Sequence, residues 1–400
     1  HCCPAVNQDP SAETYDPAYK VAELRDYLEE RYKRLFIPGQ QLSLDETLIR
    51  AFGRIKFKVR IVTKAARYGI KVYVLTDAQT AYVLRVIFYT GKSTYYINQA
   101  SEDQLKTVQV VNELVEPFAG SHRTVYVDRF YTSLDLLISL AEKDLYLTGT
   151  MLANRIPQQV RIAKKSTTYR GMKRGDAVKC KVAFTTGNGK KSEAGLVCWR
   201  DRNIVYCLSN DSNNFEFDEC CRRGEGGIIR IPRPISIAQY NKYMGCVDLA
   251  DMKRLHCNST IMGQNRWWLK LFFYLLDVGT SNALVLYNEH LRMRSERDPV
   301  PKWNIVQFKM QLVVDLVGRL ITDLFDTSCD HVQEHVAVQI EGGGRSRCAF
   351  CSLMSRVCRT RYQCSVCGVP LCAMGSGKVK NDCFSQAHET EDRRQMVCTK

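Results

Sequence analysis

Cysteine is distributed unevenly along this 400-residue chain, and that distribution constrains the fold more than any other feature of the sequence. Eight of the 18 cysteines fall between Cys348 and Cys398. Within that stretch Cys348 and Cys351 form one C-x2-C pair, and Cys364 and Cys367 form a second. A C-x2-C turn directs two thiolates at one tetrahedral ion, and two such turns close together are typical of structural zinc sites. The C-terminal segment is therefore predicted to fold around zinc.

The candidate ligands outnumber those that one zinc ion needs. Seven side chains are suitably spaced, namely Cys348, Cys351, Cys364, Cys367, Cys372, Cys383 and His388, with Cys358 a candidate eighth. Because one tetrahedral site takes four ligands, the segment holds one ion or two, and a two-zinc cross-brace leaves the pairing of ligands open. Disulfides are the competing interpretation. They are disfavoured because the other ten cysteines lie scattered, mostly in apolar sequence, as expected of buried thiols in a reducing compartment.

The charge of the chain favours a polyanionic partner. Its 57 Lys and Arg residues exceed its 42 Asp and Glu residues, which gives a formal net charge of +15. Basic surfaces gain affinity for nucleic acid by releasing counterions from phosphates. An anionic membrane is the alternative, but the sequence has no uninterrupted run of about 20 apolar residues and no signal-peptide pattern. The most apolar stretch, residues 265–292, contains Lys270 and Asp277, which favours a buried core helix.

The pattern of apolar residues predicts an α/β fold. Strands are expected at QLSLDETL and at residues 56–62, 70–76, 82–89, 123–127 and 145–150. Helices are expected at residues 20–35, 105–117, 132–143, 237–254, 265–292 and 307–324. Between residues 156 and 236 short β-like runs alternate with charged turns and glycines, which indicates a β-rich insertion.

Three aspartates occupy informative positions in this plan. Asp45 lies near the end of the first predicted strand, Asp128 follows a later strand, and Asp248 lies on a helix after the insertion. A ribonuclease-H-like fold has two aspartates on adjacent central strands and a third carboxylate on a later helix. Phosphodiester cleavage proceeds by in-line displacement, which two Mg²⁺ ions about 4 Å apart stabilise, and Mg²⁺ prefers carboxylate oxygens.

Each aspartate also has a simpler interpretation. Asp45 and Asp128 would serve equally well as N-caps of helices that follow them. Asp248 and Asp251 lie three residues apart on one helix face and would serve as solvated surface charges. The combined placement on two strands and a helix favours the catalytic interpretation.

Six sequence blocks, spread in order over roughly residues 35–295, resemble successive blocks of the piggyBac transposase family. They are SLDETLIRAFGR, YGIKVYVLTD, VDRFYTSLDLL, GLVCWRDRNIVYCLSN, PISIAQYNKYMGCVDLADM and NRWWLKLFFYLLDVGTSNALVLY. The resemblance implies a ribonuclease-H-like DDD transposase core, interrupted by a β-rich insertion and followed by a small zinc-binding cross-brace tail. It implies that Asp45, Asp128 and Asp248 are catalytic and bind Mg²⁺ or Mn²⁺, with Asp251 as an additional acidic residue beside them.

The resemblance also implies partners and a location. Members of the family excise an element through hairpinned ends and reinsert it at TTAA targets. We therefore expect a homodimer on double-stranded DNA, in the nucleus, with no membrane partner. Positions near DNA match Arg54, Arg129, Ser133, Arg155 and Trp267. The alternatives are ordinary surface polarity for the first four and a core tryptophan for Trp267.

The sequence departs from the family pattern in two places. Cys246 in MGCVD replaces the second glycine of the usual MGGVD, and a cysteine adopts positive φ only at a cost, which would disturb the placement of Asp248. The segment KAARYG replaces the usual KPxKxG. These departures favour a domesticated DNA-binding protein with weakened catalysis, whereas three intact aspartates favour an active transposase. A RING-like ubiquitin ligase module or a chromatin reader is a further interpretation of the tail.

The predicted organisation follows from these features. It comprises the end of an N-terminal helical region (1–35), the first part of the core (36–155), the insertion (156–236), the helical second part of the core (237–327), a linker (328–346) and the cysteine-rich domain (347–390). The chain begins with His1 instead of methionine, so we expect it to be a fragment of a longer protein.

Overall fold

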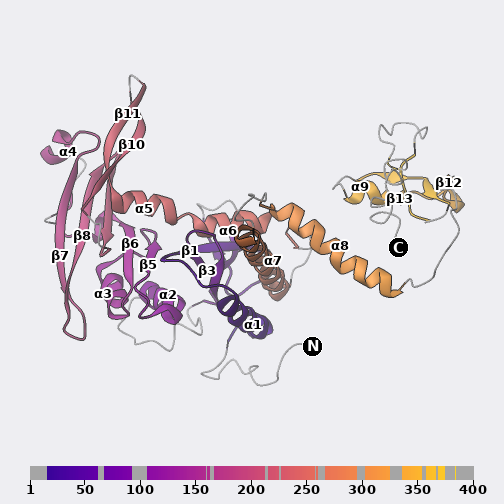
Figure 1. The fold of residues 1–400 in the computed structure, drawn as a ribbon, viewed down its shortest axis with the longest axis horizontal. Helices are drawn as coiled ribbons and strands as arrows, with labels where there is room; N and C mark the ends of the chain where they lie inside the picture. Colours follow the sequence, from indigo (N-terminus) through magenta and orange to yellow (C-terminus); the bar gives the residue numbers. More distant parts are fainter. Residues whose placement is uncertain are drawn as a thin grey trace. The chain divides into compact units, whose positions relative to one another are not determined.

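The computed structural model (Figure 1) forms two compact units, His1–Val306 and Gln307–Lys400. It describes residues 16–61, 67–91, 106–158, 160–162, 166–211, 215–224, 227–256, 258–259, 266–294, 302–324, 336–353, 357–365, 368–373 and 383.

The first unit is built on one mixed sheet of nine strands. The strands are β1 (Gln41–Arg50), β2 (Val59–Arg60), β3 (Tyr68–Asp77), β4 (Val83–Phe88), β5 (Thr124–Val127), β6 (Tyr146–Met151), β7 (Ala177–Thr185), β8 (Lys191–Arg200) and β9 (Ile204–Ser209). Their order is β2-β3-β1-β5-β6-β9-β8-β7, and β4 also pairs with β3. β1 is antiparallel to β3 but parallel to β5, and β5 is parallel to β6. The remaining pairs are antiparallel.

The helices of the first unit are α1 (Tyr19–Leu35), α2 (Lys106–Val115), η2 (Glu116–Phe118), α3 (Leu134–Glu142), η3 (Ala153–Arg155), α4 (Thr167–Gly171), α5 (Ile235–Tyr243), α6 (Cys246–Leu255) and α7 (Trp267–Arg294). Five of them pack against the sheet in two groups. α1, α6 and α7 pack together and against β1, β3 and β4, whereas α2 and α3 pack together and against β3, β4 and β6. Every residue of β5 is buried, which shows that both faces of the sheet are covered there.

Local sequence explains most of these elements, and the differences from the predicted ones are informative. β1 continues through ETLIR to Arg50, so Asp45 lies in its middle and not near its end. Of the strand predicted at 56–62, the described residues 56–61 contain the two-residue β2. The helix predicted at 237–254 is interrupted by a turn at residues 244–245, which separates α5 from α6.

The region between residues 156 and 236 extends the sheet and adds a hairpin to it. β9 pairs with β6, so β7, β8 and β9 continue the central sheet. β10 (Phe217–Gly224) and β11 (Gly227–Pro234) form a separate antiparallel pair. In Figure 1 this hairpin projects beyond the neighbouring strands.

α7 is an apolar helix that is anchored by polar contacts. It is the one described helix that is long and apolar enough to cross a membrane, and half of its apolar window is buried. The buried carboxylate of Asp277 accepts hydrogen bonds from the backbone N–H and the hydroxyl of Ser259. The buried amide of Asn282 bonds both the N–H and the C=O of Val83 in β4, at 2.8 Å each. Interior polar groups need such partners, and here they tie the helix to the domain core.

The second unit is small. It contains most of α8 (Ile305–Leu324), together with β12 (Ala337–Gln339), η4 (Glu341–Gly343), β13 (Ser346–Arg347), α9 (Ala349–Leu353), β14 (Arg359–Thr360) and β15 (Tyr362–Cys364). β12 pairs with β15, and β13 pairs with β14. Its buried cluster consists of Cys348, Cys351, Val369, Leu371, Cys372 and Cys383. Four of these six residues are cysteines, so thiols replace the usual aliphatic core.

The contacts of Asn282 predict a stability effect. We expect Asn282→Ala to lower the free energy of unfolding by about 2–3 kcal/mol, because it strips both hydrogen bonds from the buried backbone of Val83. Thr280→Ala, on the same helix, removes only a bond to the helix's own Leu276 carbonyl and should change it by less than about 0.5 kcal/mol. Urea denaturation measures both, and equal effects of the two substitutions would contradict this role.

Candidate active site and cysteine cluster

Asp45 and Asp128 lie side by side in the centre of the sheet. Leu44 and Val127 are the last paired residues of the parallel strands β1 and β5, and each aspartate is the next residue along its chain. Burial raises the pKa of the Tyr240 hydroxyl, and the charges of Asp128 and Asp45 raise it further. Both carboxylates therefore lie close enough to Tyr240 of α5 to raise its pKa.

Neither of these aspartates is a helix N-cap. β1 continues beyond Asp45, so no helix begins there. The N-cap of α3 is Ser133, whose hydroxyl accepts a hydrogen bond from the Leu136 N–H at 3.1 Å. Asp128 instead accepts a bond from the N–H of Phe130 at 2.8 Å. The helix-capping interpretation is therefore wrong for both residues.

The electrostatic environment of Asp128 disfavours its negative charge. Burial raises the pKa of its carboxyl, and the N–H of Phe130 offsets part of that effect. The nearby negative charge of Glu46 raises the pKa of Asp128 further. Glu46 itself accepts a hydrogen bond from the Tyr131 hydroxyl at 2.9 Å. A half-buried carboxylate in such surroundings is stabilised by a cation.

The turn after α5 and helix α6 are held against β1 by two hydroxyl groups. The Ser43 hydroxyl donates to the backbone carbonyl of Met244 at 2.9 Å, and that of Thr47 donates to the carboxylate of Asp251. Alternate residues of a strand share a face, so both contacts lie on one face of β1. The start of α6 therefore crosses this face.

This crossing brings the third aspartate toward the other two. Asp45 lies between Ser43 and Thr47 on the same face of β1. Asp248 lies in the chain between Met244 and Asp251, the residues to which those two hydroxyls donate. Asp248 is exposed, and its side chain has no hydrogen bond or ion pair with the described residues. The carboxylate oxygens of the three aspartates do not all come within 4.8 Å of one another. The structure thus places the three aspartates on adjacent elements, but their carboxylates do not converge on a single metal position.

Asp251 has a different environment. One of its oxygens accepts from Thr47, and the other bonds Arg254 at 3.2 Å. Arg254 is buried and lies over the ring of Tyr274, 4.9 Å from its centroid. Asp251 therefore fastens α6 to β1 and to α7, which makes it a positioning residue for the site.

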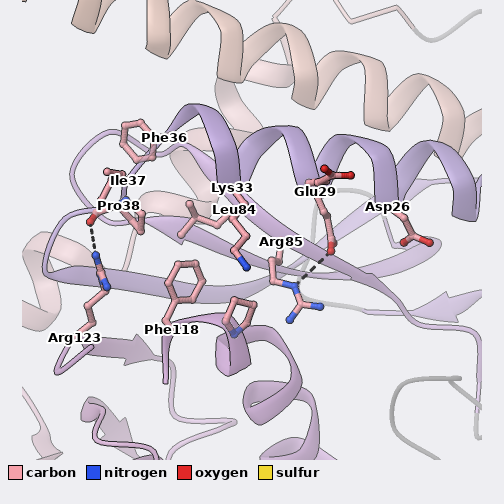
Figure 2. Close-up of a pocket in the computed structure, with 12 residues that line it drawn as sticks. Asp26, Glu29, Lys33, Phe36, Ile37, Pro38, Leu84, Arg85, Phe118 and Arg123 are labelled. Atoms are coloured by element: carbon pink, nitrogen blue, oxygen red, sulfur yellow. Dashed lines mark hydrogen bonds and ion pairs between the residues drawn. The ribbon is translucent and has the colours of Figure 1, made fainter. Parts of the chain in front are cut away.

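A cavity of about 440 Å³ lies elsewhere in the first unit. Figure 2 shows it bordered by α1, by the segment that follows α1, and by η2. Arg85 extends along it and pairs with Glu29 at 3.4 Å, and Arg123 donates to the carbonyl of Pro38 at 2.9 Å. None of the three aspartates borders this cavity. The Glu29–Arg85 pair ties α1 to β4 across this cavity.

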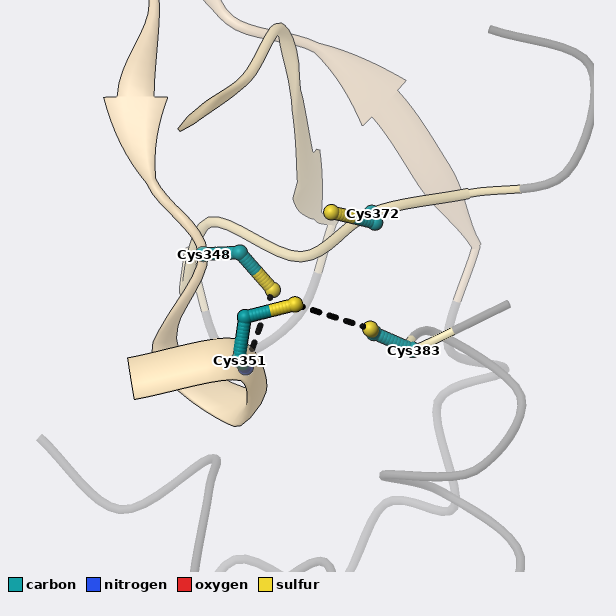
Figure 3. Close-up of side chains that lie close together, drawn as sticks. All are labelled: Cys348, Cys351, Cys372 and Cys383. Carbon is teal, nitrogen blue, oxygen red and sulfur yellow. Dashed lines mark hydrogen bonds between the residues drawn. The ribbon is translucent and has the colours of Figure 1, made fainter. Parts of the chain in front are cut away.

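Four cysteines of the second unit form a candidate metal centre (Figure 3). The sulfur atoms of Cys348, Cys351, Cys372 and Cys383 lie within 4.8 Å of one another, and all four residues are buried. The Cys351 and Cys383 sulfurs are 3.4 Å apart, and the Cys351 N–H donates to the Cys348 sulfur at 3.4 Å. Burial raises the pKa of the Cys372 thiol to about 12. This set could hold a metal ion, because a bound cation favours the thiolate that burial disfavours.

The other predicted zinc ligands lie outside this group. Cys364 is buried at the end of β15 and does not join the four sulfurs, and Cys358 packs beside them without being one of them. Cys367 and His388 fall outside the residues that the structure describes. The group of four therefore skips one C-x2-C pair in the sequence.

Comparison with a family model provides the identification. The model described as Transposase IS4 matches residues 3–284, which is more than half of the chain. The chain belongs to this family, in its piggyBac branch.

Known relatives agree with this assignment. The chain is 24% identical over 377 residues to human PiggyBac transposable element-derived protein 3, and the match covers 89% of this chain and 58% of that protein. A human chimeric ERCC6-PGBD3 protein is also 24% identical over 377 residues, with 32% of its length covered. The chain thus spans little more than half the length of the first relative.

The fold has a counterpart among solved structures. A piggyBac transposase, determined by cryo-EM in a synaptic complex with hairpin DNA, superposes with a TM-score of 0.62 at 21% identity. The match covers 89% of this chain and 72% of that one. The chain therefore has a mixed α/β fold that resembles the piggyBac transposase.

The residues that the piggyBac resemblance placed near DNA differ in exposure and in whether their side chains already make contacts within the fold. Arg54 and Arg129 are exposed. Arg155 donates to the carbonyl of Thr132 at 2.9 Å and so supports the loop after Asp128. Trp267, at the start of α7, is half-buried.

The ring of Trp267 has a clear packing role. It meets Phe57 edge to face, with a centroid separation of 5.3 Å. Aromatic contacts of this kind add about 0.5–1.5 kcal/mol beyond area burial. A core role therefore accounts for this tryptophan without DNA.

Two tyrosines near the acidic pair were missed by the sequence reasoning. Tyr240 accepts a hydrogen bond from Thr150 at 3.3 Å, and Tyr131 donates to Glu46. Tyr240 lies on α5, before the turn that leads to Asp248, so helical spacing to Asp248 does not mark it. Tyr131 follows Asp128 in a loop, where no periodicity marks it.

Cys246 does not strain the family motif, so that expectation is wrong. It is the first residue of α6, and the described non-glycine residues with positive φ are Ala81, His122 and Asp144. The preceding Gly245 has φ of −76°, so neither position uses the conformational freedom of glycine. The buried Cys246 thiol donates to the carbonyl of Ala78 at 3.0 Å.

Restoring the usual glycine should therefore destabilise the protein. We expect Cys246→Gly to lower the free energy of unfolding by about 1–2 kcal/mol, since glycine costs about 1 kcal/mol in a helix and leaves the thiol's site empty. Cys246→Ala keeps the helical preference and should cost less than Cys246→Gly. Chemical denaturation of both variants checks the order, and a stabilising Cys246→Gly would mean that the wild-type backbone is strained.

Proposed function

We propose that this protein is a DDD transposase of the piggyBac type, which cuts and joins DNA phosphodiesters with Asp45, Asp128 and Asp248. The observation that carries the proposal is the parallel register of β1 and β5, which brings Asp45 beside Asp128 under the start of α6. The antiparallel order β4-β3-β1 followed by parallel β5 and β6 supports the ribonuclease-H-like core that is part of this proposal.

The donor set fits Mg²⁺ or Mn²⁺. Carboxylate oxygens are the ligands that these ions prefer, and few are required from the protein. Within the described ranges no lysine or arginine forms an ion pair with Asp128 or Asp248. Burial and the charge of Glu46 also raise the pKa of Asp128. Among the described residues, no ion pair with a lysine or arginine therefore neutralises the carboxylates of Asp128 and Asp248.

The protein groups divide the catalytic work. Two divalent ions, when bound, would stabilise the attacking and leaving oxygens of an in-line displacement. The central strands hold Asp45 and Asp128 rigidly, and Asp251 fixes the helix that carries Asp248. Asp248 is exposed, so its side chain is free to turn toward the other two and toward DNA that approaches from solvent.

The substrate side of the proposal rests on charge and on relatives. A net charge of +15 suits double-stranded DNA, and the similar piggyBac transposase was solved with hairpin DNA. We propose transposon ends and TTAA sites as substrates, a homodimer as the assembly that holds them, and the nucleus as the location.

A domesticated DNA-binding protein is the second candidate. The observation in its favour is that the first human relative is named as an element-derived protein. The helical backbone at Cys246 removes the main sequence argument for weakened catalysis. The two candidates predict different results for cleavage.

Substitution of Asp128 separates metal binding from DNA binding. We expect Asp128→Ala to reduce cleavage of transposon-end DNA in Mg²⁺ by more than about 100-fold, since even the loss of an outer partner of a metal ligand costs 10–100-fold. DNA affinity should stay within about threefold, because it depends on lysine and arginine contacts with phosphate. Asp135→Ala, at an exposed position in the first turn of α3, is the control and should retain cleavage. An inactive wild type that still binds DNA would favour the domesticated protein.

We further propose that the second unit is a zinc-binding cross-brace. Cys348, Cys351, Cys372 and Cys383 make a four-thiolate set suited to tetrahedral Zn²⁺. The skipped pair, Cys364 and Cys367, would serve a second ion together with His388, and Cys358 is the candidate that completes it. Interleaving of the two ligand sets along the chain is the mark of a cross-brace.

Zinc content tests this second proposal. We expect the purified chain to contain one or two zinc ions, and Cys372→Ser to contain about one fewer, with the second unit becoming sensitive to protease. The reason is that zinc-binding energy is folding energy in a unit of this size. Cys221→Ser, which changes an exposed thiol of the first unit, should leave both properties unchanged. A wild type without zinc, or a protease-resistant second unit after chelation, would contradict the proposal.

A further inference from the structure

The β10–β11 hairpin has two faces of different character. On its inner face Cys220 and Ile231 are buried in a cluster with Trp199 of β8. The indole N–H of Trp199 donates to the carbonyl of Pro232 at 2.9 Å. The base of the hairpin is therefore fixed to the sheet by apolar packing.

The outer face is exposed along its length. Cys221 pairs with Arg230, and Arg223 pairs with Ile228, and all four side chains are exposed. Ile228, next to the tip, is 78% exposed. Glu219 is the acidic residue of this face and lies at the base of the hairpin. Arg223 and Arg230 therefore dominate the charge of the distal half in the described residues.

The arginines around the inner face are already neutralised. Arg174 and Arg222 share the carboxylate of Asp201, at 2.6 and 3.2 Å. Arg233 forms a two-point pair with Asp218, at 2.9 and 2.5 Å. These three arginines stabilise the hairpin and lower the pKa of the two aspartates, so their charge is balanced locally.

The two outer arginines have no such compensation. Within the part of the chain that the structure describes, the side chains of Arg223 and Arg230 form no ion pair and no hydrogen bond. They are diagonal neighbours across the strands, so their Cβ atoms start about 7–8 Å apart. Both guanidinium groups can therefore reach one phosphate backbone.

The surrounding sequence is also basic. Residues 156–236 contain 16 Lys and Arg residues against 8 Asp and Glu residues, so a fifth of the chain carries more than half of its net charge of +15. The arginines of the inner face are paired with aspartates, whereas those of the outer face are unpaired within the described residues. The outer face therefore presents positive charge that complements a polyanion. We propose that the outer face of the β10–β11 hairpin binds the phosphate backbone of double-stranded DNA, with Arg223 and Arg230 as the contacts. This proposal rests on the proposed function for its choice of DNA as the polyanion.

The chain path limits where on the DNA this contact falls. β11 leads directly into α5, which carries Tyr240 to the acidic site. From Arg230 to Tyr240 the backbone path is at most about 22 Å, at roughly 3.3 Å per strand residue and 1.5 Å per helix residue. One turn of duplex is about 34 Å long. The hairpin should therefore contact DNA within about one turn of the cleaved phosphate.

Charge substitution with a matched control tests the proposal. The test pair is Arg223→Gln with Arg230→Gln, and its control is Lys181→Gln with Lys190→Gln in the same insertion. The control lysines are exposed and already paired, with Glu193 at 3.1 Å and Asp144 at 3.7 Å. Binding of the full-length chain to a 40-base-pair transposon-end duplex would be measured across a series of salt concentrations.

The expected result is a change in the salt dependence. The slope of log affinity against log salt should become shallower by about 1.8 in the test pair, since each phosphate contact contributes about 0.9. Affinity near physiological salt should fall roughly tenfold, and Arg223→Lys with Arg230→Lys should recover most of it because the charge returns. The control pair should change affinity by less than about twofold.

Other outcomes overturn the inference. Equal weakening by both pairs would mean that only overall charge matters, and an unchanged slope in the test pair would mean that the hairpin does not touch phosphate. Weakening by Ile228→Ser, with unchanged binding in the test pair, would mean that the face contacts DNA through its apolar side chain and not through the two arginines. Cleavage assays distinguish the two proposals. If the wild type does not cleave DNA but the hairpin variant loses DNA affinity, only the transposase activity is refuted. Retained affinity in the hairpin variant beside a cleaving wild type refutes only the hairpin contact.

Discussion

The pairing of β1 with β3 on one side and with β5 on the other determines where the chain can place its acidic residues. Side chains alternate between the faces of a strand, so a slip of one residue in this register would carry Asp45 to the opposite face. Nine consecutive pairs with β3 and four with β5 hold the register. The hydroxyls of Ser43 and Thr47 then use the same face to seat the start of α6. One strand thus positions two elements of the proposed site.

Charged side chains of this protein fall into two groups, those paired with an opposite charge and those without a described ion-pair partner. Where arginines support the fold, as at Arg233 and Arg254, a carboxylate lies against them and cancels the charge. At Asp128 a charge is buried without a described ion-pair partner, and at Arg223 a charge is exposed without one. A buried charge costs stability unless a group of opposite sign pairs with it, whereas an exposed charge is solvated and available to a polyanion. A divalent cation at the first position and a phosphate backbone at the second would provide that balance.

The second unit depends on a different source of stability. Its buried cluster in the described residues is mostly thiol, with Val369 and Leu371 as its aliphatic members. Burial raises the pKa of the Cys372 thiol and so opposes its ionisation in the absence of a cation. Metal coordination, as proposed for this unit, would turn these same groups into its strongest contacts. The arrangement explains why cysteines far apart in the sequence converge there.

What the sequence determined by itself was local. Periodicity predicted the helices near residues 20–35 and 105–117 and the strands around 70–76 and 123–127, because each pattern depends on neighbours within a few residues. Two C-x2-C pairs were visible for the same reason. Tertiary structure alone decided which cysteines converge, that Cys246 is helical, and that Asp251 is engaged by Thr47, which lies 204 residues away. It also decided that Arg222 is paired while its neighbour Arg223 faces solvent. These outcomes depend on strand register and on contacts between distant segments, and no local pattern of residues encodes a partner that lies hundreds of residues away.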